Sequence, residues 1–417
     1  MSSRFKTRRI EVAAALLEQA LYAGSSFVSQ IYVARQNAAD VFGAFSVATA
    51  VFFLAALAHQ TFLVEPAYVF SSGRYREKMH AYHAEIFGKW SICVGLGICA
   101  FFSTAGICAL SYGSNELGLA LLAYAFSAPL LLHLWLARRL MVLRGNGLIA
   151  LKAIALYALS LFSMLAAAYL ADAHSPTVVI LGMGGSAALS AIIFNRRLLK
   201  EIRGDGLEAP AEMILQHVRY GRWSFLTEMI IWSIANLPLI VMPMIFSFAA
   251  SSALRVVSLI FMPLQQVVSV ASMFMLRRFA GNGNAGPSKN EIFIANSLLF
   301  LASTIYTACA YIFAPYMHIF FGESYVIEKR WVAIGGVGVI FFIALQASVS
   351  VLRVRELSRV VLFLHGVALL LMSAAASLLY KYGVDGVLIA QAITWSLVCA
   401  QGVLVVVRLN LRSKAIS

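Results

Sequence analysis

The sequence predicts an all-α polytopic membrane protein in which twelve transmembrane helices form two six-helix bundles. Of its 417 residues, 61% are apolar and 12% are charged, whereas soluble domains have about 45–50% and about 25%. The mean hydropathy is +0.84. Apolar runs of about 20 residues, the length that crosses a hydrocarbon core of about 30 Å, recur along the whole chain. This composition argues against a soluble enzyme, a secreted disulfide scaffold and a nucleic-acid-binding domain.

The twelve apolar segments are separated by short polar connections. In chain order they cover 11–33, 41–64, 86–110, 116–137, 149–171, 176–194, 223–246, 252–276, 292–316, 331–352, 360–380 and 384–407. The longest polar connection follows the sixth segment. We therefore expect an N-terminal bundle over 1–196, a cytoplasmic linker over 197–222 and a C-terminal bundle over 223–417.

The linker mixes charged residues with Gly204, Gly206 and Pro210, and resumes as an amphipathic stretch after Ala211. The apolar residues of this stretch are expected to lie on the membrane surface; they are Met213, Ile214 and Val218.

Basic residues gather in alternate connections. The two termini and the connections 65–85, 138–148, 195–222, 277–291 and 353–359, with the adjoining helix ends, hold 27 of the 32 Lys and Arg residues. Cytoplasmic loops carry such an excess, so both termini are expected inside the cell. The formal charge of +14 is therefore interpreted as a topology signal and a contact for anionic lipid, not as a nucleic-acid-binding surface.

The sequence shows no pattern that points to a cofactor or a metal. All five cysteines lie within apolar runs, and no Cys/His spacing typical of zinc occurs. No glycine-rich phosphate loop occurs either. We expect no cofactor and no bound metal, and ATP-driven transport by this chain alone is not supported.

The two halves show signs of an internal repeat. A shift of 210 residues places Glu18 on Glu228, at the same depth in the first helix of each half. Both halves then enter the membrane from the same side, which implies a pseudo-two-fold axis along the membrane normal and a site between the halves. Chance similarity between apolar segments is the alternative explanation.

Four short segments, in their order and spacing, resemble those of a known transporter superfamily. They are Ala39-Asp40-Val41-Phe42-Gly43-Ala44-Phe45-Ser46, Arg219-Tyr220-Gly221-Arg222-Trp223, the run from Ser252-Ala253-Leu254-Arg255-Val256-Val257 to Pro263-Leu264, and Phe321-Gly322-Glu323-Ser324-Tyr325. Together they resemble the multidrug/oligosaccharidyl-lipid/polysaccharide flippase superfamily, and within it the bacterial polysaccharide-export branch, over nearly the whole chain.

The resemblance implies a flippase of the bacterial inner membrane. Its cargo would be an undecaprenyl-pyrophosphate-linked oligosaccharide, moved by alternating access for polysaccharide (O-antigen or exopolysaccharide) biosynthesis, and its partners would include the bilayer and a polysaccharide polymerase or export complex. A multidrug/cation antiporter of the same superfamily is the alternative. A membrane-embedded glycosyltransferase or polymerase is a third interpretation, but the longest outer connection, about 317–330, carries few catalytic side chains.

The first helix carries a polar stripe. Glu18, Tyr22, Ser25 and Ser29 recur at helical spacing on one face. An ionisable group inside a membrane requires a cavity or a partner, so we expect this face, with Glu18, to line a hydrated cavity. A helix interface held by small polar side chains is the alternative.

Other candidate cavity residues lie on the first, seventh and eighth helices. Arg35 and Arg255 stand near outer helix ends, where a guanidinium matches the phosphates of the implied cargo. Either arginine alternatively extends to lipid headgroups. Glu228 and Asn236 complete the predicted cavity on the seventh helix.

Ionisable residues within several helices are candidates for proton coupling. They are Glu18, Glu228, Glu65, His59 and His365, since an intramembrane Glu/His set is typical of proton-coupled transporters. A buried histidine that hydrogen-bonds to a backbone carbonyl is the commoner explanation for each histidine.

Overall fold

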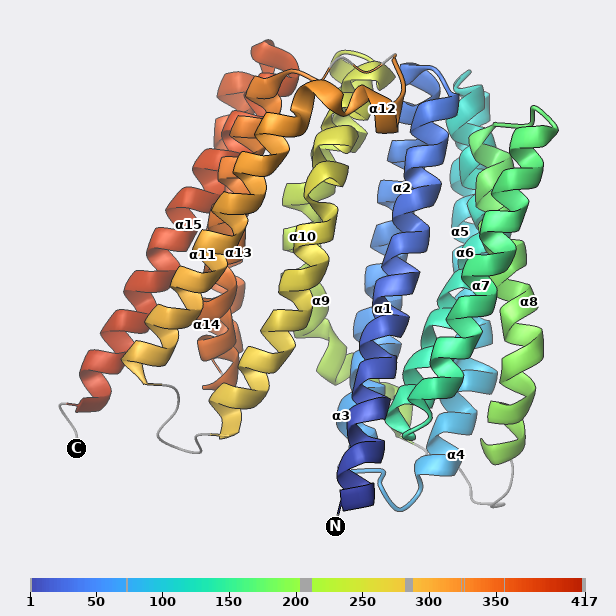
Figure 1. The fold of residues 1–417 in the computed structure, drawn as a ribbon, viewed down its shortest axis with the longest axis vertical. Helices are drawn as coiled ribbons and strands as arrows, with labels where there is room; N and C mark the ends of the chain where they lie inside the picture. Colours follow the sequence, from blue (N-terminus) through green and yellow to red (C-terminus); the bar gives the residue numbers. More distant parts are fainter. Residues whose placement is uncertain are drawn as a thin grey trace. The chain divides into compact units, whose positions relative to one another are not determined.

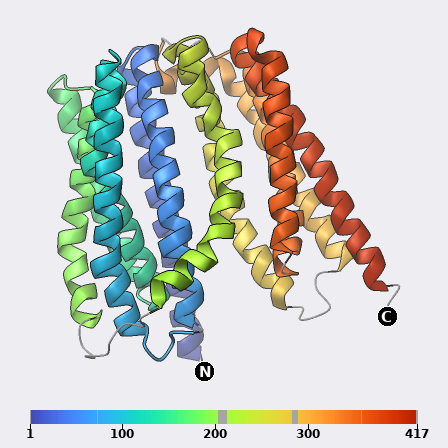
Figure 2. The same ribbon diagram turned by 180° about the vertical axis from the view of Figure 1, so that it is seen from behind.

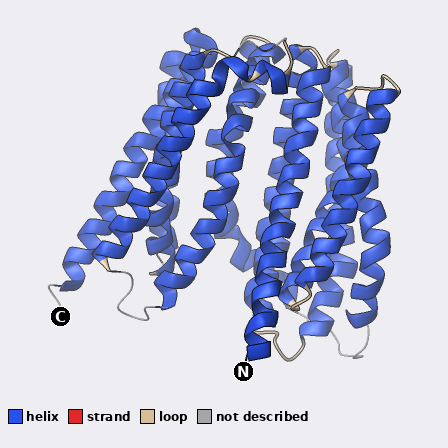
Figure 3. Ribbon diagram, in the orientation of Figure 1, coloured by secondary structure: helices blue, strands red, loops and turns tan. Residues whose placement is uncertain are grey.

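The structure is a computed structural model that describes residues 2–72, 74–202, 212–281, 288–323, 325, 327–355 and 357–414. All regular elements in these ranges are helices, and none is a strand (Figure 3). Intrahelical bonding satisfies the backbone polar groups of each segment, which the membrane interior requires. The predicted all-α polytopic fold class is confirmed.

The chain divides into two compact units, Met1–Phe225 and Leu226–Ser417 (Figure 1). The first unit contains α1 (Ser2–Gln36), α2 (Ala39–His59), α3 (Glu65–Ser72), α4 (Met79–Ala84), α5 (Ser91–Ser111), α6 (Asn115–Leu143), α7 (Gly147–Leu170) and α8 (Pro176–Ile202). The π-helical turn η1 (Gln60–Val64) joins α2 to α3, and η2 (Glu85–Trp90) joins α4 to α5.

The boundary between the units falls inside α9 (Met213–Ile245). The second unit continues with α10 (Phe248–Gly281), α11 (Lys289–Phe313), η5 (Ala314–Tyr316), α12 (His318–Phe321), α13 (Lys329–Val354), α14 (Ser358–Leu379), η6 (Tyr380–Tyr382) and α15 (Gly383–Lys414).

The described ranges contain twelve long helical segments. Ten ranges in the described part of the chain are long and apolar enough to span a membrane. One of these, Arg359–Arg408, covers most of both α14 and α15, and α1 adds a further helix of 35 residues.

The same helix pairs pack in both units. In the first unit the fourth long helix, α6, packs against the second, third and sixth, which are α2, α5 and α8. In the second unit the fourth long helix, α13, likewise packs against α10, α11 and α15. The fifth helix also packs on the sixth in each unit. This shared pattern supports the internal repeat.

The third long helix of each unit lies at the outside of its bundle. Figure 2 shows α5 at the front of the first unit. Leu96 on α5 is 66% exposed, and Leu298 on α11 is 61% exposed. Apolar side chains this exposed are compatible with contact to lipid chains.

The start of α9 belongs to the first unit and packs inside it. Met213 is 2% exposed and belongs to a buried cluster with Val64 and Tyr82. The expectation that Met213 lies on the membrane surface is therefore wrong. His217 holds the helix in place, because its Nδ1 contacts the carbonyl oxygen of Phe62 and its Nε2 the hydroxyl of Tyr82, both at 2.8 Å. The linker residues 203–211, with Gly204, Gly206 and Pro210, lie outside the described residues.

One close helix contact gives a stability prediction. A Cβ atom at Gly184 on α8 would lie 2.8 Å from the Cα of Ser127 on α6, whereas one at Gly185 would meet nothing within 4 Å. Gly184→Ala should therefore destabilise the protein by about 1–3 kcal/mol through overpacking. Gly185→Ala should stabilise it by about 0.5–1 kcal/mol through helix propensity. Unfolding midpoints of the two purified variants should move in opposite directions; equal midpoints would contradict the close approach of α8 to α6 at Gly184.

Candidate functional site

The polar stripe of α1 lies inside the packed first unit. Glu18, Ser25 and Ser29 are each 0% exposed, and α1 packs against α7. The hydroxyl of Ser25 donates to the carbonyl oxygen of Leu21 at 2.8 Å, and that of Ser29 donates to the carbonyl oxygen of Ser25 at 2.9 Å. In this conformation the stripe is a helix interface. The expectation that these side chains face an open cavity is therefore not met here.

Glu18 forms a buried ion pair with Arg138 of α6. Arg138 Nη1 donates to Glu18 Oε1, and both side chains are 0% exposed. The guanidinium carbon lies 3.8 Å from the ring centroid of Tyr22 and 5.7 Å from that of Trp135. A cation over aromatic faces is attracted by their negative π-clouds, so the rings support the charge where water does not reach it.

The hydrogen-bonding capacity of this pair is only partly used. Glu18 Oε2, Arg138 Nε and Arg138 Nη2 are buried and form no hydrogen bond with any residue that the structure describes. Desolvating two charges costs several kcal/mol each, and incomplete hydrogen bonding leaves part of that cost uncompensated. Each charge therefore depends strongly on the other.

The second unit contains a related pair. Arg353 Nη2 on α13 donates to Glu228 Oε1 on α9 at 3.4 Å. In both units a glutamate on the first helix thus pairs with an arginine on the fourth. The second pair is more open, since its side chains are 45% and 34% exposed.

Sequence reasoning missed the role of Arg138. It counted Arg138 and Arg139 together as charges at an inner helix end, although α6 continues to Leu143. The available signal was the apolar residues that follow the arginines and keep Arg138 within the helix. Which of two adjacent arginines points inward could not be told from hydropathy.

The remaining predicted cavity residues lie in different surroundings. Arg255 on α10 is 6% exposed, whereas Arg35 at the end of α1 is exposed. Asn236 is partly buried on α9, where its Nδ2 donates to the carbonyl oxygen of Trp232 at 3.3 Å.

The predicted proton-coupling residues are spread over separate helices. Glu65 Oε2 accepts a hydrogen bond of 2.6 Å from Ser224 Oγ. His365 Nδ1 contacts the carbonyl oxygen of Val361 at 2.8 Å. His59 is 2% exposed, and neither of its ring nitrogens forms a hydrogen bond within the described ranges. No group of three or more His, Cys, Asp or Glu residues suited to a metal ion occurs in those ranges.

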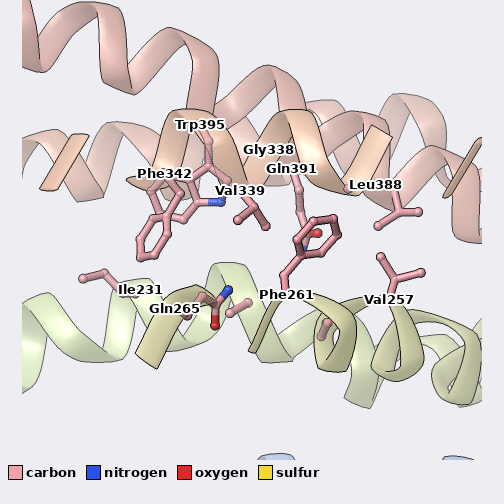
Figure 4. Close-up of a pocket in the computed structure, with 13 residues that line it drawn as sticks. Ile231, Val257, Phe261, Gln265, Gly338, Val339, Phe342, Leu388, Gln391 and Trp395 are labelled. Carbon is pink, nitrogen blue, oxygen red and sulfur yellow. The ribbon is translucent and has the colours of Figure 1, made fainter. Parts of the chain in front are cut away.

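A cavity of about 220 Å³ lies within the second unit, between α9 and α10 on one side and α13 and α15 on the other (Figure 4). Sequence reasoning named none of its residues as a site. They are Ile231, Ala235, Val257, Ser258, Phe261, Gln265, Gly335, Gly338, Val339, Phe342, Leu388, Gln391 and Trp395. The signal that could have indicated it is the presence of Gln265 and Gln391 in apolar helices, where amides are costly without partners.

The fold is similar to solved transporter structures over nearly its whole length. An inward-facing multidrug resistance MATE family transporter of the MOP superfamily superposes with a TM-score of 0.75 and 15% identity, covering 96% of each chain. An outward-facing structure of a multidrug resistance MATE family transporter superposes with a TM-score of 0.71 and 14% identity, covering 99% of this chain and 96% of the other. The chain has the same fold as these structures.

A third structure with the MOP fold is a transporter from Pyrococcus furiosus, whose binding pocket has a reverse polarity that suggests a different function. It superposes with a TM-score of 0.69 and 13% identity, covering 95% of this chain and 94% of that protein. No protein-family model and no curated protein matches the sequence.

Proposed function

We propose that this protein is a flippase of the bacterial inner membrane. It moves an undecaprenyl-pyrophosphate-linked oligosaccharide from the inner to the outer leaflet by alternating access, for polysaccharide biosynthesis. Support comes from the MOP fold together with the order of the four polysaccharide-flippase-like segments. The sugar headgroup crosses through the protein while the lipid tail stays in the bilayer, and both termini lie in the cytoplasm.

The observation that carries this choice over a cation antiporter is the pairing of Glu18 with Arg138. A cation is bound through carboxylates, but the acidic group of α1 is already neutralised by a buried arginine. Arg255 adds a second deeply buried guanidinium, in the second unit. Arginines suit an anionic cargo, because the guanidinium fork matches phosphate oxygens. The Pyrococcus furiosus transporter is a precedent for this fold with a pocket of reverse polarity.

Deleting the gene should make complete lipid-linked repeat units accumulate on the cytoplasmic leaflet and should remove the surface polysaccharide. The measurement is extraction of lipid-linked sugars, together with an assay of surface polymer. Restoring the gene on a plasmid should reverse both effects. Unchanged polysaccharide together with new sensitivity to cationic dyes would contradict the proposal and favour the antiporter.

A further inference from the structure

The cavity in the second unit combines aromatic rings with uncharged polar groups. None of its lining residues is ionisable. Its polar side chains are two amides and one hydroxyl, and three aromatic rings stand among them; the six residues are Gln265, Gln391, Ser258, Phe261, Phe342 and Trp395. Figure 4 shows Gln265 on the side of the cavity opposite Phe342 and Trp395, and the ring of Phe261 next to Gln391.

We infer that this cavity binds one neutral pyranose ring. A pyranose presents C–H groups on its flat faces and hydroxyl groups around its edge. The C–H faces suit the negative π-faces of aromatic rings, and the hydroxyls suit amides, which both donate and accept hydrogen bonds. The inference rests on the proposed function in one respect, the origin of the sugar: under that function, the pyranose belongs to the oligosaccharide headgroup of the cargo.

The size and charge of the cavity favour this ligand over others. Pockets for drug-sized molecules measure about 300–1,000 Å³, so a cavity of about 220 Å³ suits a single ring. A cationic drug or a phosphate would enter without a counter-charge among the lining residues. A lipid chain has no hydrogen-bonding groups, so it would leave the amides of Gln265 and Gln391 without a partner in the ligand.

Trp395 is held firmly as one wall of the cavity. It is 7% exposed, and its ring centroid lies 4.7 Å from that of Phe342 at an interplanar angle of 60°. His365 on α14 packs edge-on against the same ring, with centroids 6.4 Å apart. His365 Nδ1 also contacts the carbonyl oxygen of Val361 at 2.8 Å, which holds this imidazole beside the ring of Trp395.

The two amides leave hydrogen-bonding groups for a ligand. Gln391 Nε2 donates to the carbonyl oxygen of Ile234 at 3.1 Å, which fixes the amide and keeps its oxygen as an acceptor. Gln265 is exposed on α10 and forms no hydrogen bond with another described residue. A sugar hydroxyl can therefore donate to Gln391, and Gln265 can both donate and accept.

The test is saturation-transfer difference NMR on the full chain in lipid nanodiscs, because glycoside detergents would compete for the cavity. The probes are methyl glycosides of glucose, galactose and N-acetylglucosamine. Gln265→Ala should weaken binding about 2- to 10-fold, the loss of one hydrogen bond. Trp395→Ala should weaken it about 10-fold through lost stacking.

Two variants control for folding and position. Gln266→Ala, the adjacent amide outside the cavity lining, should bind the glycosides like the unchanged protein. Trp395→Phe keeps an aromatic wall and should retain binding better than Trp395→Ala, with an unfolding midpoint close to that of the unchanged protein.

The inference is overturned if no glycoside gives a signal, or if Gln265→Ala and Gln266→Ala bind equally. It is also overturned if these substitutions weaken binding of the cationic dye rhodamine 6G and leave the glycosides unaffected. Sugar binding to purified protein requires no transport. If gene deletion leaves polysaccharide unchanged while the glycosides still bind through Gln265, the proposed function fails and the saccharide site stands.

Discussion

Replacing Arg138 with alanine is expected to destabilise the protein by about 3–5 kcal/mol, because the substitution leaves the carboxylate of Glu18 buried without a counter-charge. The ring of Tyr22 would also lose the cation that it covers. This loss is a large fraction of the roughly 5–15 kcal/mol by which a typical domain is stable, so we expect much less folded protein at physiological temperature. Thermal unfolding of detergent-solubilised protein, followed by size-exclusion chromatography, measures the effect.

Two other arginines supply matched controls. Arg139, the next residue, is partly buried and donates to Gln19 Oε1 at 2.8 Å. Arg353 forms the open pair with Glu228. The exposed ion pair of Arg353 contributes only about 0–1 kcal/mol, so Arg353→Ala should move the midpoint slightly. Arg139→Ala removes one partly buried hydrogen bond to a neutral amide, worth about 0.5–1.5 kcal/mol, and should lower the midpoint less than Arg138→Ala does. If Arg138→Ala unfolds at the same temperature as Arg139→Ala, the buried pair is not as the structure places it.

The double variant Glu18→Leu/Arg138→Leu separates stability from transport. Replacing both charges by apolar groups of similar size is often neutral or stabilising, so the double variant should regain most of the lost stability. If it is folded but inactive, the ion pair serves transport. If it is folded and active, the pair serves only the packing of α1 on α6.

Hydropathy was sufficient to locate the helices, because a membrane-spanning helix must be long and apolar whatever it packs against. It was less informative about where they end. The first apolar run covers 11–33, whereas α1 covers Ser2–Gln36. Helix α9 likewise begins at Met213, ten residues before its apolar run at 223. Intrahelical hydrogen bonds do not need apolar side chains, so helices continue into the polar connections.

The candidate site was less predictable, since it depends on which helix faces meet. Helical spacing correctly placed Glu18, Ser25 and Ser29 on one face, but could not show that α1 packs on α7 or that Glu18 pairs with Arg138 of α6. The cavity in the second unit draws its residues from four helices, α9, α10, α13 and α15. A glutamine in an apolar helix signals a polar contact, yet only the fold reveals that Gln265 and Gln391 share one cavity.

Replacing Arg255 with alanine is expected to reduce export of the lipid-linked oligosaccharide about 10- to 150-fold, if the guanidinium holds the pyrophosphate. That range corresponds to about 1.5–3 kcal/mol for a hydrogen bond to a charged group. Arg255 is 6% exposed and is not itself a lining residue of the cavity in the second unit, but it lies three residues before the lining residue Ser258 on α10. The measurement is surface polysaccharide per amount of folded transporter in the membrane.

Arg35 provides the matched comparison, because it is an exposed arginine at a helix end and suits contact with lipid headgroups. Arg35→Ala should therefore export nearly normally. Arg255→Lys keeps the charge but loses the planar fork, so its export should fall between those of Arg255→Ala and the unchanged protein. Normal export by Arg255→Ala at a normal protein level would remove Arg255 from the cargo site. A loss in Arg255→Ala that the lysine does not relieve, in a protein with an unchanged unfolding midpoint, would indicate that fork geometry rather than charge holds the phosphate.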